Sequence, residues 1–152
     1  MVDKSPLKKM QEIRFELAKT NAADDLGIGL GFLRMVQKRV SSPVPGCIPP
    51  GNELPTKDTV RAYCLAFMIE TAEFIQTLDW KPWKNKAKPC DTERALDEFA
   101  DIMAFLGIIV EHLYRMGITP GDLAEAYRKK SIINVDRFLG EHGSEYHQET
   151  LK

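Results

Sequence analysis

Apolar residues recur every three or four positions along most of the chain, which is the spacing of a helix that buries one face. The pattern predicts helices over residues 6–19, 32–40, 57–78, 93–116 and 120–139. No segment shows the strict alternation of apolar and polar residues that is typical of a β-strand. The sequence therefore predicts an all-α fold, a bundle of four or five helices.

Two connectors interrupt this pattern. Five prolines between Pro43 and Pro55 predict a loop, because proline has no amide proton for a helical hydrogen bond. The second connector, "DWKPWKNKAKPCD", covers residues 79–91, and Pro82 disfavours helix there. The residues expected to cap the helices are Thr56 or Asp58, Thr92, Gly117, and Thr119 or Asp122.

Three glycines at alternate positions precede the predicted helix over residues 32–40. Their spacing differs from GxGxxG, and no predicted strand leads into them, which disfavours a phosphate-binding loop. We therefore expect Gly27, Gly29 and Gly31 to form a flexible approach to that helix.

The composition is typical of a globular protein, with 43% hydrophobic and 28% charged residues. A formal net charge of −1 does not favour a duplex nucleic-acid partner. The first 20 residues lack the apolar core of a signal peptide, and the longest apolar run, "IMAFLGIIV", is too short to cross a bilayer. We therefore expect neither a nucleic-acid partner nor a membrane partner.

The three cysteines, Cys47, Cys64 and Cys90, form no CxxC pair, which predicts reduced thiols rather than a disulfide framework or a zinc site. That cysteine usage favours a cytoplasmic location. We expect a single domain over residues 1–140, followed by a polar, mobile tail over residues 141–152.

Two pairs of carboxylates occupy successive long helices. Glu70 and Glu73 lie in the helix over residues 57–78, and Glu98 and Asp101 lie in the next. A spacing of three places both members of a pair on one helix face, where like charges repel. Asp101 is embedded in strongly apolar sequence, so its charge needs a partner or a metal ion. An all-oxygen site of this kind suits Mg²⁺ or Mn²⁺.

Two other interpretations of these carboxylates remain open at this point. Each pair could form a solvated helix face matched by lysines, since a single ExxE is common. A di-iron bundle is a second alternative, but it normally requires Glu-x-x-His motifs, and the chain has none. The histidines, which we expect at the surface rather than as ligands, are His112, His142 and His147.

The chain also contains cationic and aromatic residues of the kinds that contact the phosphates and the base of a nucleotide. Tyr127, Lys130, Asn134 and Arg137 follow one another at spacings of three, four and three, so they share a helix face suited to a polyphosphate. Indole rings stack nucleobases and nearby lysines reach phosphates, although tryptophans can equally cover a core. In the second connector the relevant residues are Trp80, Lys81, Trp83 and Lys84.

With these motifs the chain resembles the all-α nucleoside triphosphate pyrophosphatases, whose metal motif is ExxE followed, after a spacer, by ExxD. It is most similar to the dimeric dUTPases and the phage-type dCTP/dUTP pyrophosphatases of this MazG-related superfamily. "WKPWK" after the ExxE helix and "YxxKxxxNxxR" in the last helix carry the resemblance to that branch. The resemblance covers about residues 56–137, with a weaker similarity at "KMQ" in the first helix.

The resemblance implies hydrolysis of dUTP, dCTP or both to the monophosphate and pyrophosphate, by a homodimer in a bacterial or phage-infected cytoplasm. It implies that Glu70, Glu73, Glu98 and Asp101 hold Mg²⁺, and that Glu73 orients or deprotonates the attacking water. It implies phosphate contacts from Lys81, Lys84, Lys130, Asn134 and Arg137, and base or sugar contacts from Gln11, Trp80, Trp83 and Tyr127.

Three questions stay open in the sequence. Uracil and cytosine differ by hydrogen bonds at the base edge, and no motif distinguishes them here. A MazG-like enzyme for another or modified nucleotide is one alternative, and a helical nucleotide-binding module without turnover is another. Either tryptophan of the connector could face the base.

Overall fold

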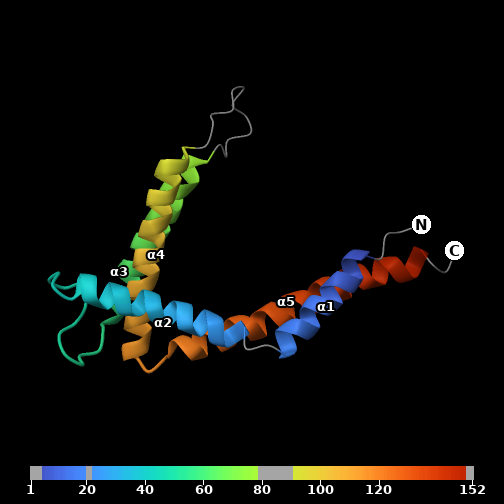
Figure 1. Ribbon diagram of the computed structural model, residues 1–152, viewed down its shortest axis with the longest axis horizontal. Coiled ribbons are helices and arrows are strands. Elements are labelled where there is room, and N and C mark those ends of the chain that lie inside the picture. Colours follow the sequence, from blue (N-terminus) through green and yellow to red (C-terminus); the bar gives the residue numbers. More distant parts are fainter. Residues whose placement is uncertain (1–4, 20–21, 79–90, 150–152) are drawn as a thin grey trace. The chain divides into compact units, whose positions relative to one another are not determined.

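The structure, a computed structural model, describes residues 5–19, 22–78 and 91–149, and every regular element in these ranges is a helix (Figure 1). This confirms the prediction of an all-α fold. The helices are α1 (Ser5–Lys19), α2 (Ala22–Ser41), α3 (Lys57–Thr77), α4 (Thr92–Arg115) and α5 (Pro120–Glu149).

The helices belong to two compact units. The first comprises Met1–Ile28 and Pro120–Lys152, and the second comprises Gly29–Thr119. No single described helix is long and apolar enough to cross a bilayer, although Thr92–Arg115 and Pro120–Gly140 pass that test as a bent pair.

The helix ends agree with the sequence in part. Thr56 caps α3, because its side chain accepts a hydrogen bond from the Thr59 amide at 3.1 Å. The prediction of Thr92 as the next cap is wrong by one residue. Asp91 caps α4, since its carboxylate accepts from the Arg94 amide at 3.2 Å and its charge suits a helix N-terminus. Gly117 follows α4 with a φ of 90°, as expected for the end of a helix.

Two other segments differ from the prediction. Gly27, Gly29 and Gly31 lie inside α2, so the expected flexible approach is wrong and the helix begins at Ala22. The last helix was expected to end near Leu139, but α5 continues to Glu149, and Gly140 lies within it. Helical hydrogen bonding in these places overrides the low helix propensity of glycine.

In the first unit, α1 packs against α5 (Figure 1). Arg14 of α1 forms a bidentate ion pair with Asp136 of α5: Nε donates to Oδ1, and Nη2 donates to Oδ2 at 3.3 Å. Ala124 and Val135 of α5 are buried. A two-pronged contact of this kind fixes the register of the two helices.

In the second unit, α3 and α4 pack side by side in opposite directions (Figure 1). Tyr63 near the start of α3 meets Phe105 in the second half of α4, with 6.2 Å between ring centroids. Phe74 near the end of α3 meets Phe99 in the first half of α4, at 5.6 Å. Because residue numbers rise on one helix as they fall on the other, the pair is antiparallel.

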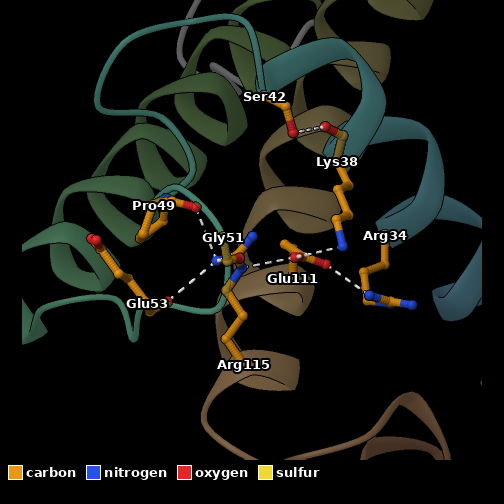
Figure 2. Close-up of polar contacts among 8 residues, drawn as sticks. All are labelled: Arg34, Lys38, Ser42, Pro49, Gly51, Glu53, Glu111 and Arg115. Carbon is orange, nitrogen blue, oxygen red and sulfur yellow. Dashed lines mark hydrogen bonds and ion pairs between the residues drawn. The ribbon is translucent and has the colours of Figure 1, made fainter.

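A buried carboxylate joins α2 to α4 (Figure 2). Glu111 of α4 is 1% exposed and forms ion pairs of 2.8 Å with both Arg34 and Arg115. Lys38 lies 3.9 Å away, and the Arg34 guanidinium also stacks over the Tyr114 ring at 3.9 Å. A carboxylate removed from water in this way is stable only with such partners, and Arg34 and Lys38 of α2 therefore hold α2 against α4.

The same network anchors the loop that precedes α3. Arg115 donates through Nη1 to the backbone carbonyl oxygens of Pro49, Gly51 and Glu53 at 2.9, 3.0 and 3.2 Å (Figure 2). The same unit contains a small apolar core formed by Cys47, Ile48 and Ile108, with Tyr63 and Phe105 packed against it.

His112 lies next to this network and is completely buried, so its expected surface position is wrong. Its ring packs 5.3 Å from the Tyr63 ring, and neither ring nitrogen forms a regular hydrogen bond within the described residues. Burial and the positive charge of Arg115 lower its pKa, while Glu111 and the Cys47 backbone oppose the shift. At neutral pH the folded protein therefore favours the neutral form of His112.

We expect acid to destabilise the second unit through His112. Its folded-state pKa lies below the ordinary value of about 6.5, so between these two pKa values the unfolded chain binds more protons than the folded chain. The free energy of unfolding should fall as the pH drops below neutrality, by at most about 1.4 kcal/mol per pH unit for one proton. Urea denaturation of wild-type and His112→Gln protein between pH 7 and pH 5 measures this slope, and an unchanged slope in the variant would contradict the assignment.

Gly107 allows α4 to approach α2 closely. A Cβ atom there would lie 2.6 Å from Gln37 Cγ and 2.9 Å from the Leu33 carbonyl oxygen. Gly107→Ala should lower the free energy of unfolding by about 1–3 kcal/mol, because the backbone of α2 must move. The control is Gly29→Ala, whose Cβ meets no atom within 4 Å and which should be neutral or stabilising by about 0.5–1 kcal/mol. Urea denaturation compares the two, and an equal effect would contradict the close approach.

Candidate metal and nucleotide site

The antiparallel pairing of α3 and α4 brings the two carboxylate motifs together. Glu70 and Glu73 lie in the last two turns of α3, and Glu98 lies in the second turn of α4. One carboxylate oxygen from each of these three residues lies within 4.8 Å of the other two. The three residues are intermediate in burial, whereas Asp101, one turn beyond Glu98, is exposed. The sequence spacing thus produces a convergent group of three carboxylates.

The spacing of these oxygens fits a hard divalent cation. Ligand oxygens lie about 2.1 Å from Mg²⁺, so two oxygens on one ion are at most about 4.2 Å apart. A small rotation of one carboxylate would close the remaining gap. All the ligands are oxygens, which suits Mg²⁺ or Mn²⁺ rather than zinc or copper. The residues present therefore fit the metal that the sequence motifs predict.

The electrostatics of the group favour a bound cation. Partial burial, and then the neighbouring charges of Glu73, Asp101 and Glu98, raise the pKa of Glu70 above its ordinary value. Asp101 contributes to this field although it is not one of the three converging residues. Ionised carboxylates at these distances repel one another, and a divalent cation relieves that repulsion.

One cation already touches the group. Arg94, one turn before Glu98 on α4, donates through Nε to Glu98 Oε1 at 3.1 Å. Arg94 also lines an open hollow of about 610 Å³ beside α4, together with Asp91, Glu93 and Asp97. We did not predict a role for Arg94 from the sequence, although its i, i+4 spacing from Glu98 was a usable indication.

The remaining predicted residues belong to the first unit or lie outside the described residues. Tyr127, Lys130, Asn134 and Arg137 are exposed on α5, and Gln11 is exposed on α1, so all five belong to the first unit. Their contacts with a nucleotide stay predictions. Trp80, Lys81, Trp83 and Lys84 lie outside the described residues.

Comparison with models of known protein families gives a match. Residues 48–114 match a family model described as dUTPase. The match runs from the loop before α3 almost to the end of α4, and so includes Glu70, Glu73, Glu98 and Asp101. No curated protein and no solved structure matches the chain. The family match and the all-helical structure together fit a dUTPase-like family of all-α nucleoside triphosphate pyrophosphatases, the family that the sequence motifs predict.

Proposed function

We propose that this protein hydrolyses dUTP, dCTP or both to the nucleoside monophosphate and pyrophosphate, with Mg²⁺ as its cofactor. The convergence of Glu70, Glu73 and Glu98 within 4.8 Å carries the proposal, because it brings together oxygen ligands of the kind that a divalent metal prefers, at the ExxE and ExxD motifs. The family match supports the coarser statement, a nucleotide pyrophosphatase that hydrolyses dUTP.

Glu70, Glu73, Glu98 and Asp101 are the residues that would hold the metal. Bound there, Mg²⁺ would neutralise the phosphate oxygens and make a bound water more acidic. The protein itself holds the four carboxylates on two rigid helices, so their positions are set before a nucleotide binds. Manganese offers the same preference for oxygen ligands and is the natural substitute.

Glu73 is the proposed base. Its carboxylate accepts a hydrogen bond from the attacking water and then its proton, while the oxygen of the leaving pyrophosphate departs on the opposite side of the phosphorus. Glu73 belongs to the converging group of three carboxylates and is only partly exposed to solvent. This mechanism needs no covalent nucleophile.

The predicted nucleotide contacts complete the proposal. Lys81, Lys84, Lys130, Asn134 and Arg137 are the proposed phosphate ligands. Gln11, Trp80, Trp83 and Tyr127 are the proposed base and sugar contacts.

We also propose a homodimer. Leu65, Met68 and Ile69 lie on one face of α3 and are all more than half exposed. A second copy of the chain would remove this apolar surface from water.

A nucleotide panel with a pyrophosphate readout tests the activity. We expect pyrophosphate from dUTP or dCTP that requires Mg²⁺, and a loss of about 10²–10⁴-fold in kcat for Glu73→Ala, the range for removal of a general base. Glu53→Ala is the control, because that carboxylate lies in the loop before α3, outside the converging group. Normal turnover by folded Glu73→Ala protein would contradict the mechanism. Release of pyrophosphate only from other nucleotides would indicate a MazG-like specificity, and binding without release would indicate a non-catalytic module.

Glu70→Gln tests the metal site without an activity assay. Because the pKa of Glu70 is raised, its ionised form is disfavoured in the folded protein, and an uncharged side chain relieves that repulsion. At neutral pH we therefore expect a higher Tm for the variant than for wild type without metal, and a smaller increase in Tm on adding Mg²⁺. Thermal denaturation with EDTA and with Mg²⁺ measures both, with Glu53→Gln as the control. An undiminished Mg²⁺ response in Glu70→Gln would argue against this site.

A further inference from the structure

We propose that Arg94 is a mobile phosphate ligand of this site, which pairs with Glu98 in the metal-free protein and passes to the nucleotide when a divalent metal occupies the carboxylates. This inference rests on the proposed function, and it adds a residue that neither the motifs nor the family match assigns.

The geometry makes Arg94 free to move while Glu98 stays in place. The two residues lie one turn apart on α4, and Arg94 Nε meets Glu98 Oε1 at 3.1 Å. The Arg94 side chain is 54% exposed, whereas the Glu98 side chain is only 13% exposed. The carboxylate is therefore held among protein atoms, and the guanidinium reaches it from the solvent side.

The position of Arg94 does not suit a purely helix-stabilising role. Asp91 caps α4, so Arg94 is the third residue of the helix, where the exposed amide groups carry partial positive charge. A cation is disfavoured there, and an ion pair on a helix is more stable when the acid precedes the base. Here the base precedes the acid. The arrangement makes better sense as charge compensation for the carboxylates than as support for the helix.

Arg94 is the one lysine or arginine in the described part of the chain that forms an ion pair with any of the four carboxylates. A divalent cation that binds Glu98 competes with it directly, because both positive charges require the same carboxylate and repel each other. Metal binding therefore weakens the Arg94–Glu98 pair and frees the guanidinium.

The guanidinium of Arg94 also borders the open hollow beside α4. Arg94 is the only cation among the described residues that line the 610 Å³ hollow, and the acidic residues there are Asp91, Glu93 and Asp97. These carboxylates repel a triphosphate. A guanidinium offers a fork of N–H donors that matches two phosphate oxygens. Among the described residues that line the hollow, Arg94 is therefore the one whose charge attracts a phosphate.

Two binding measurements on Arg94→Gln test the proposal. With Mn²⁺ alone, followed by the electron paramagnetic resonance signal of the free ion, the variant should bind about threefold to tenfold more tightly, because a competing positive charge is gone. With Mg²⁺ and an α,β-imido analogue of dUTP, the variant should bind the nucleotide about tenfold or more weakly, because a charge-assisted phosphate contact is lost. Arg94→Lys should resemble wild type in the first measurement and fall between the two in the second.

Arg61→Gln is the matched control, since Arg61 pairs with Asp58 at 3.3 Å on the exposed first turns of α3. It should change neither affinity. A purely structural role for Arg94 predicts weaker binding in both measurements, and that result, or no change in either, would overturn the proposal. Failure of wild-type protein to bind Mn²⁺ would instead contradict the proposed function, and the Arg94 inference would fall with it.

Discussion

The antiparallel packing of α3 against α4 is the constraint on which the site depends. The contacts of Tyr63 with Phe105 and of Phe74 with Phe99 fix the register of the two helices. That register places the end of one helix beside the start of the other, and so brings Glu70 and Glu73 to Glu98. A shift of one turn on either helix, about 5.4 Å, would separate the carboxylates beyond the reach of a single ion.

Helix α4 carries carboxylates in two contrasting environments. Glu111 is buried and has three cations within 4 Å, two of them at 2.8 Å, so the protein itself compensates its charge. Glu98 and Asp101 lie near Glu70 and Glu73 of α3, and among the described residues Arg94 forms an ion pair with Glu98. The first arrangement joins α2, α4 and the loop before α3 and needs no ligand. The second leaves negative charge uncompensated, which is the property of a site that binds a metal.

Much of the fold follows from local patterns. Helical periodicity predicts the all-α class, and the threonine before α3 and the glycine after α4 mark helix ends with recognisable chemistry. The missed features depend on contacts between distant residues or on the choice between similar neighbours. Glu111 meets Arg34 across 77 positions in the sequence, and Asp91 and Thr92 are both good capping residues. The glycines of α2 show that low helix propensity at single positions yields to the surrounding helix.

The same contrast between predicted and missed features applies to the candidate site. Regular spacing within each helix predicts which carboxylates share a face, and the pairing of the helices then brings three of them together. Arg94 was missed because an ion pair between residues one turn apart is common on helix surfaces. It points to a function only when the other carboxylates are seen to lie nearby. Diffraction from crystals soaked in Mn²⁺, measured at the manganese absorption edge, tests the central claim most directly. The account predicts an anomalous peak at bonding distance from Glu70, Glu73 and Glu98, and a fully occupied ion elsewhere with none at these residues would contradict it.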